Sequence, residues 1–180
     1  FGVRGSAYRW LQIYLEDRTQ TVSLDEVLSQ PKPLACGVPQ GSVLGPLIFT
    51  CYIQPLGEII RSRGLQCHFY ADDSQLYFCF NPQTDRASAI ASVNSCIQDV
   101  ATWMINNFLK LNDDKTKVLA FGTKAKIQAL GSFTVQTGPH SVSPAQVAKN
   151  LGVLFDQQMT MNPHISNICR SVYHQIYNIA

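Results

Sequence analysis

The sequence predicts an α+β fold in which helices cover one face of a mostly antiparallel sheet. Its segments follow the order helix, strand, helix, hairpin, helix, short strands and helix, which is typical of this class. Hydrophobic residues make up 46% of the 180 residues, enough for one substantial core. The chain contains no internal repeat and no low-complexity linker.

The N-terminal part is predicted to form a helix, a strand and a loop. Apolar residues at helical spacing indicate an amphipathic helix over residues 6–17, with Ser6 as its N-cap. Residues 18–24 alternate as in a half-buried strand, and residues 25–33 are typical of a polar, proline-bearing loop.

A long helix is expected next. Glycines and prolines punctuate residues 37–46, and a helix over 42–63 should follow, capped by Gly41 or Ser42 and ended by Gly64. Pro55 should bend or interrupt this helix, because proline has no backbone N–H to donate.

The following hairpin carries two adjacent carboxylates. Strands are predicted at 67–70 and 76–80, around a polar turn at 71–74 that contains Asp72 and Asp73. Two carboxylates in a tight turn repel each other, and a divalent cation such as Mg²⁺ makes the arrangement favourable. The alternative is an ordinary turn without a ligand, because Asp is common in turns.

The second half is predicted to contain two helices and several short strands. One helix spans residues 84–106 and another begins at residue 162, each with a single apolar face. Short strands are expected at 108–111, 117–121, 132–135, 142–147 and 151–155, with Gly138-Pro139 as a connecting turn.

Composition limits the functional classes. A net charge of +2 with 14% charged residues is too weakly basic for a free-standing nucleic-acid binder. Apolar runs are shorter than the ~18 residues of a membrane span and no leader is evident, so we expect a soluble, intracellular protein. Six cysteines without a CxxC pair favour buried, reduced thiols over zinc or disulfides. The missing initial methionine and the amphipathic C-terminus suggest cuts through a larger protein.

Several blocks resemble the motifs of one enzyme family. Residues 37–49, with the sequence GVPQGSVLGPLIF, and the later FYADD at 69–73 are similar to motifs B and C of reverse transcriptases, more narrowly those of non-LTR (LINE-type) retrotransposons. Residues 1–20 resemble the segment between motifs A and B, 103–116 resemble motif D, and 150–156 resemble motif E. Such blocks in the family's order are far more specific than YADD alone.

The resemblance implies a fold and a reaction. Residues 1–148 would form part of a polymerase palm, with motif A and the fingers upstream, and 149–180 the primer-grip hairpin and the start of a helical thumb. The intact enzyme would be an RNA-directed DNA polymerase that extends a primer 3′ end by two-metal nucleotidyl transfer. Its partners would be an RNA template, a DNA primer and deoxynucleoside triphosphates, in a nuclear or cytoplasmic ribonucleoprotein without membrane attachment.

The resemblance also assigns roles to residues. Asp72 and Asp73 would be catalytic ligands of two Mg²⁺ ions, which Mn²⁺ could replace. Lys115 would be a general acid for pyrophosphate, although it also fits a solvated turn. The nucleotide and template would be contacted by Gln40, Gly41, Ser42 and Tyr70, and the primer by Leu151, Gly152 and Val153. Tyr70 equally fits core packing, since aromatic strand residues are often buried.

The implied metal site is incomplete in this chain. The family's scheme needs a further Asp from motif A, which would lie upstream of Phe1. Asp25 is a poor substitute, because a glutamate and a proline-bearing loop follow it, and it is typical of a loop carboxylate. We therefore expect the isolated chain to be inactive. The alternatives are a non-catalytic remnant that binds nucleic acid or protein, and a reverse transcriptase of another class such as an intron maturase.

Overall fold

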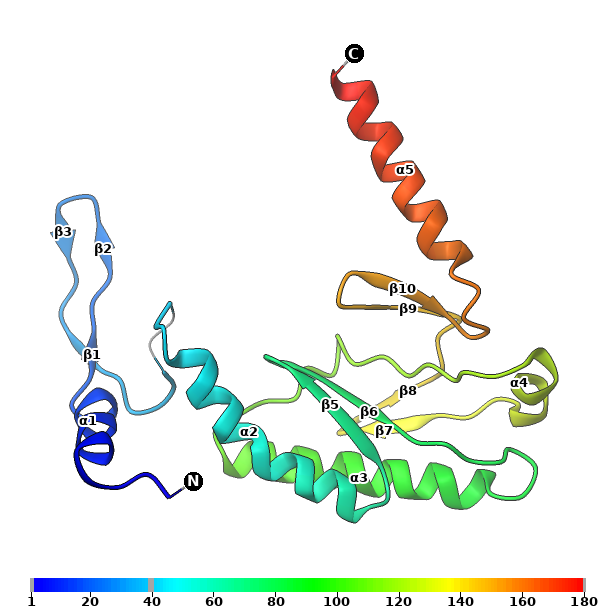
Figure 1. Ribbon diagram of the computed structural model, residues 1–180, viewed down its shortest axis with the longest axis horizontal. Helices are drawn as coiled ribbons and strands as arrows, with labels where there is room; N and C mark the ends of the chain where they lie inside the picture. Colours follow the sequence, from blue (N-terminus) through cyan, green and yellow to red (C-terminus); the bar gives the residue numbers. More distant parts are fainter. Residues whose placement is uncertain (1, 39–40, 180) are drawn as a thin grey trace. The chain divides into compact units, whose positions relative to one another are not determined.

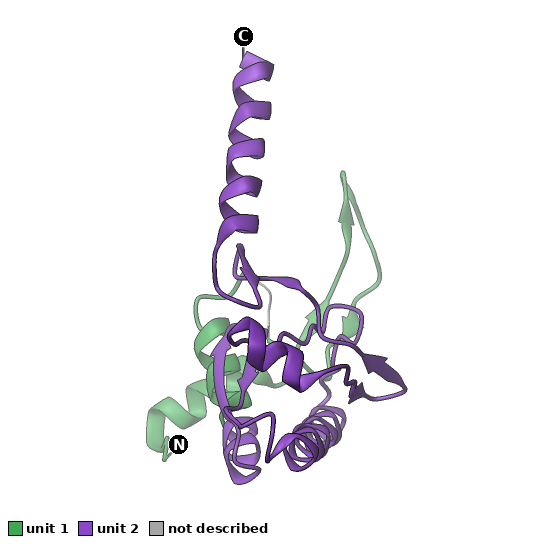
Figure 2. Ribbon diagram, turned by 90° about the vertical axis from the view of Figure 1, so that its right-hand side faces the viewer, with its two compact units in different colours: residues 1–54 green, residues 55–180 purple. Residues whose placement is uncertain are grey.

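The computed structural model describes residues 2–38 and 41–179 (Figure 1). Within these residues it contains five helices and ten short strands, and the strands form five separate two-stranded antiparallel sheets. The α+β class and the antiparallel pairing are confirmed, but the described strands do not join into one sheet. The chain divides into two compact units, Phe1–Gln54 and Pro55–Ala180, coloured green and purple in Figure 2.

The first unit contains a helix and two small strand pairs. Helix α1 spans Gly5–Leu15 and follows Arg4, so Ser6 lies inside the helix and is not its cap. The strands are β1 (Thr19–Gln20) paired with β4 (Lys32–Pro33), and β2 (Ser23–Leu24) paired with β3 (Val27–Leu28). The strand predicted at 18–24 is thus present only as β1 and β2, interrupted at residues 21–22. The predicted loop at 25–33 is wrong, because it contains β3 and β4 and a tight turn at Asp25, with φ of 51°, folds residues 23–28 into a hairpin. All eight strand residues are exposed.

Helix α2 (Gly45–Ser62) continues through Pro55, so the expected interruption at this proline does not occur. Its C-terminus is as predicted. Gly64 has φ of 77° and donates its N–H to the Arg61 carbonyl at 2.9 Å, while the Leu65 N–H donates to the Ile60 carbonyl at 3.3 Å. This pair of bonds is a Schellman motif, in which a left-handed glycine ends the helix.

The core of the second unit lies between two helices and a hairpin. Helix α3 spans Arg86–Asn106, close to its predicted range, and the hairpin consists of β5 (Gln66–Tyr70) and β6 (Asp73–Tyr77). The core side chains are Leu56, Ile60, Leu65, Cys96 and Val100, with Cys67, Phe69, Leu76 and Phe78 packed against them. Gly57 permits this packing, because a Cβ there would lie 3.3 Å from the Phe69 ring. Helices thus cover one face of the hairpin.

The six cysteines are free thiols, as predicted, but their predicted burial holds fully only for Cys96. Burial raises the pKa of Cys96 to about 11, which keeps this thiol protonated and unreactive at neutral pH. Cys36, Cys79 and Cys169 are exposed, because the apolar segments around them do not all reach the core.

Residues beyond α3 form a further helix and two hairpins. Helix α4 (Lys124–Leu130) was not predicted, although Thr123 caps it by accepting the Lys126 N–H and Gly131 follows it. The strand pairs are β7 (Val135–Thr137) with β8 (His140–Val142), and β9 (Val147–Asn150) with β10 (Val153–Asp156). The Gly138-Pro139 turn is confirmed between β7 and β8. Strand β7 packs against α3.

The strands predicted at 108–111 and 117–121 are absent from the described residues. Phe108 has φ of 54°, and the Leu109 N–H donates back to the Met104 carbonyl, so this segment completes the end of α3. The second segment forms no strand and makes isolated backbone bonds, such as that from the Ala145 N–H to the Val118 carbonyl at 2.8 Å. A strand-like composition was therefore not enough to form a regular strand pair here.

Helix α5 (Asn162–Ile179) confirms the predicted C-terminal helix and packs its start against β10. The junction is organised by Asp156, whose carboxylate accepts the N–H groups of Gln158, Thr160 and Met161 at 2.9 to 3.1 Å and the Thr160 hydroxyl at 3.0 Å. No described helix has the length and apolarity needed to cross a membrane.

Asp156→Asn is expected to destabilise this junction, mainly above pH 4. Partial burial acts to raise the pKa of Asp156, but the bonds from Thr160, Gln158 and Met161 outweigh it and leave the pKa below its ordinary value. A lowered pKa means that the ionised carboxylate stabilises the folded chain above the unfolded pKa of about 3.9, and that this contribution is lost as the pH falls through the folded pKa.

Urea midpoints of the chain measured from pH 6 to pH 2.5 test this expectation. The difference between the unsubstituted chain and Asp156→Asn should shrink toward low pH. Asp114→Asn is the control, because no hydrogen bond to the Asp114 carboxylate is found among the described residues. A difference that stays constant with pH would contradict the role of the ionised carboxylate.

Candidate functional site

The two adjacent carboxylates lie at the tip of the β5–β6 hairpin. Tyr70 pairs with Asp73, so the loop contains only Ala71 and Asp72, and β6 begins at Asp73. The predicted turn at 71–74 was therefore too long. Ala71 makes the shorter turn by adopting φ of 51°, since the favoured two-residue hairpin turns need a positive φ at their first loop residue. Both Asp72 and Asp73 are exposed.

Ala71→Gly is expected to stabilise the chain by about 0.5–1 kcal/mol. A positive φ costs an L-residue ~1–2 kcal/mol, whereas glycine adopts it freely but loses more entropy on folding. The free energy of unfolding in urea measures the net effect. Ala91→Gly, at an exposed position inside α3, is the matched control and should destabilise by about 1 kcal/mol. Equal losses for both variants would show that Ala71 is not strained.

The two faces of the hairpin have different environments. Phe69 and Leu76 pack against the core on the inner face, whereas Tyr70 is 66% exposed and pairs with Asp73 on the outer face. Tyr70 is therefore not a core residue, which leaves it accessible to a ligand. Farther along the outer face, His68 and Tyr77 stack at 5.4 Å between ring centroids.

The carboxylates fit part of a magnesium site. Carboxylate oxygens are the ligands that Mg²⁺ prefers, and one or two of them suffice when substrate phosphates complete the coordination shell. Within the part of the chain that the structure describes, no group of three or more His, Cys, Asp or Glu side chains could hold a metal ion.

The predicted nucleotide-binding loop lies in the first unit. Gly41 is exposed with φ of 81°, and the Ser42 hydroxyl shares a short hydrogen bond with the Tyr14 hydroxyl of α1. Helix α2 begins at Gly45, so its N-terminus does not start at Gly41 or Ser42 as predicted. Gln40 lies outside the described residues.

Lys115 lies in an exposed turn. Its backbone N–H donates to the carbonyl and to the side-chain oxygen of Asn112, both at 3.2 Å. Its ammonium group makes no hydrogen bond or ion pair among the described residues. This geometry fits both a solvated turn and an available proton donor.

The predicted primer-grip residues form the tip of the β9–β10 hairpin. Leu151 and Gly152, with φ of 45° and 87°, make the loop, and Val153 begins β10. The strand predicted at 151–155 therefore starts two residues later. Next to this loop, the Asn150 side-chain oxygen accepts a hydrogen bond from the Gln75 amide of β6 at 3.1 Å. The structure thus links the two hairpins that carry Asp73 and Leu151.

Sequence reasoning did not identify Gln75 or Asn150. Strand alternation places Gln75 on the same face as Asp73. A polar side chain at position 75 could therefore have been predicted to lie near the carboxylates. Nothing local indicated Asn150 as its partner.

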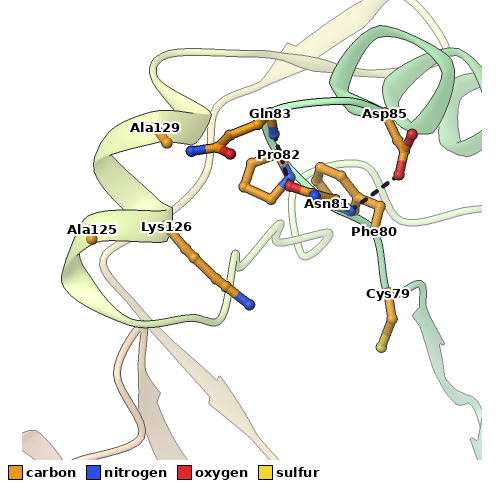
Figure 3. A pocket seen from close by; sticks show the side chains of 9 residues that line it. All are labelled: Cys79, Phe80, Asn81, Pro82, Gln83, Asp85, Ala125, Lys126 and Ala129. Carbon is orange, nitrogen blue, oxygen red and sulfur yellow. Dashed lines mark hydrogen bonds between the residues drawn. The ribbon is translucent and has the colours of Figure 1, made fainter.

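A separate cavity of about 670 Å³ lies between residues 79–85 and helix α4 (Figure 3). Its polar rim includes Lys126 and Gln83, while the Asp85 carboxylate accepts the Asn81 N–H at 3.4 Å. None of the predicted site residues lines it.

Comparisons with known proteins give consistent results. The profile of the family described as "Reverse transcriptase (RNA-dependent DNA polymerase)" matches residues 1–154. In Drosophila melanogaster, a probable RNA-directed DNA polymerase from transposon BS is 29% identical over 96% of this chain, and the RNA-directed DNA polymerase from mobile element jockey is 29% identical over 89%. A probable RNA-directed DNA polymerase from transposon X-element is 29% identical over 88%.

The chain spans only 17% to 19% of the length of these relatives. No solved structure matches it significantly.

Proposed function

Because the chain belongs to the reverse transcriptase (RNA-dependent DNA polymerase) family, we propose that it forms part of an enzyme that copies RNA into DNA. The non-LTR retrotransposon type agrees with relatives named for transposons and mobile elements. The substrates would be an RNA template, a DNA primer and deoxynucleoside triphosphates, and the enzyme would work within an intracellular ribonucleoprotein.

The observation that carries this proposal is the placement of Asp72 and Asp73. They occupy the exposed tip of a hairpin whose other face is packed against α2 and α3, so the carboxylates are presented to solvent on a supported strand. In this proposal they hold Mg²⁺, or Mn²⁺ in its place. The bound ions would activate the primer hydroxyl and neutralise charge on the triphosphate. Positioning and electrostatics would supply most of the rate enhancement.

Other residues take supporting roles in this proposal. Gly41, Ser42 and Gln40 contact the nucleotide or template, and the exposed ring of Tyr70 packs near the primer end. Lys115 donates a proton to the departing pyrophosphate, for which its free ammonium group is suited. Residues 1–148 correspond to the palm, and 149–180 to the primer grip and the start of the thumb.

The isolated chain is expected to be inactive, because no further described His, Cys, Asp or Glu joins Asp72 and Asp73 in a group that could hold a metal ion, and the upstream motif A would supply the missing ligand. Primer extension on an RNA template tests this. The 180-residue chain should incorporate no deoxynucleotide, whereas a longer protein that includes an upstream apolar strand ending in Asp should extend the primer. Robust incorporation by the chain alone would refute the expectation.

The second candidate is a non-catalytic remnant that binds nucleic acid or protein. One experiment distinguishes the polymerase from the non-catalytic remnant. Binding of a primer–template duplex without extension by the longer protein, in both Mg²⁺ and Mn²⁺, would support the remnant and exclude the polymerase.

A further inference from the structure

A side-chain hydrogen bond joins the two hairpins that carry predicted site residues. The Gln75 amide donates to the Asn150 side-chain oxygen at 3.1 Å, and both side chains are half-buried. Gln75 follows Asp73 by two residues on β6, and Asn150 immediately precedes Leu151 at the tip of the β9–β10 hairpin. The bond therefore lies close to both predicted site segments.

Because of the surroundings of Gln75, this hydrogen bond restricts the position of Asp73. Alternation along β6 places both residues on the outer face, about 7 Å apart. The inner face is fixed, because Phe69 and Leu76 pack against the core formed with α2 and α3. The strand that presents Asp73 is thus supported by helices on one face and by Asn150 on the other.

The chemistry of the pair suits this position. Two neutral amides can bond to each other without adding charge beside the carboxylates. A lysine at either position would compete with a cation for Asp73, and an aspartate would add repulsion. The amide pair joins the hairpins while leaving the charge at Asp72 and Asp73 unchanged.

We propose that Gln75 and Asn150 are positioning residues, whose hydrogen bond sets the placement of the Asp72-Asp73 tip relative to the Leu151-Gly152 loop. This inference rests on the proposed polymerase function, in which the primer end lies at these two tips. Displacement of reacting groups by about 1 Å can cost ~10²-fold in rate, so a fixed separation has a direct effect on catalysis.

The coupling between the hairpins is tested in the 180-residue chain by hydrogen exchange. Asn150→Ala should speed amide exchange at residues 72–76 of the other hairpin by about three- to tenfold, since one neutral hydrogen bond contributes a factor of this order. Gln136→Ala is the matched control, because its amide bonds to the Ser141 hydroxyl at 2.8 Å within the β7–β8 hairpin. Unchanged exchange at 72–76 in Asn150→Ala would overturn the coupling.

Positioning is tested by pre-steady-state extension with the longer polymerase that carries this chain. Gln75→Ala and Asn150→Ala should each lower the burst rate by about three- to tenfold or more without lowering the burst amplitude, whereas loss of folded enzyme would lower the amplitude. The reciprocal variant Gln75→Asn/Asn150→Gln keeps the combined side-chain length and should recover most of the rate. Burst rates within twofold of the unsubstituted enzyme, or no recovery in the reciprocal variant, would overturn the proposal.

Different results would disprove the polymerase function and the positioning role of Gln75 and Asn150. If the unsubstituted polymerase incorporates no nucleotide, the proposed function fails, and the exchange result alone then decides whether the bond orders the two hairpins. If the unsubstituted enzyme extends primers and the variants match it, the proposed function stands and the positioning role is wrong.

Discussion

Asp72→Asn and Asp73→Asn are each expected to lower primer extension by the intact polymerase by about 10³-fold. A carboxylate that holds a catalytic cation supports several kcal/mol of transition-state stabilisation, and about 4 kcal/mol corresponds to that factor. Asn keeps one oxygen ligand but removes the charge. Extension of a labelled primer on an RNA template, under single-turnover conditions, measures the loss.

The same substitutions should leave folding intact. Both side chains are exposed at the hairpin tip, so neither substitution removes core packing, and each relieves repulsion between neighbouring carboxylates. The free energy of unfolding should change by no more than about 0.5 kcal/mol, as is usual for surface positions. Asp114→Asn, an exposed carboxylate in a turn, should preserve both activity and stability. Near-normal extension by Asp72→Asn and Asp73→Asn would show that these carboxylates do not hold a catalytic metal ion.

Local signals account for the elements that the sequence predicted well. The single apolar face of residues 84–106 and the left-handed glycine at position 64 are properties of the chain itself, and helix α3 and the end of α2 follow them closely. The order of motif-like blocks was likewise sufficient to predict the family that the comparisons show. These features depend on neighbours along the chain.

The errors lie where backbone geometry or a distant partner decides the structure. The positive φ of Ala71 shortens the hairpin loop and moves Asp73 into β6, although alanine gives no sequence signal for this conformation. Residues 117–121 have a strand-like composition but pair with no strand among the described residues. The bond between Gln75 and Asn150 joins positions 75 residues apart, which periodicity cannot reveal.

Ile60→Ala is expected to destabilise the second unit by about 2–5 kcal/mol. The Ile60 side chain is fully buried between α2, α3 and the β5–β6 hairpin, and truncation of such a side chain removes apolar contact and leaves a cavity. A domain of this size has a total stability of about 5–15 kcal/mol, so the loss is a large fraction. Urea unfolding of the 180-residue chain, followed by circular dichroism, measures it.

The control is Ile105→Ala, at a position on α3 that is 73% exposed. It removes the same atoms from a solvated site and should change stability by no more than about 0.5 kcal/mol. Because the inner face of the hairpin rests on the core that contains Ile60, the buried substitution should also speed amide exchange at residues 66–77. A cost for Ile60→Ala no greater than that for Ile105→Ala would mean that the helices do not support the hairpin. In that case the placement of Asp72 and Asp73 would need a different physical basis.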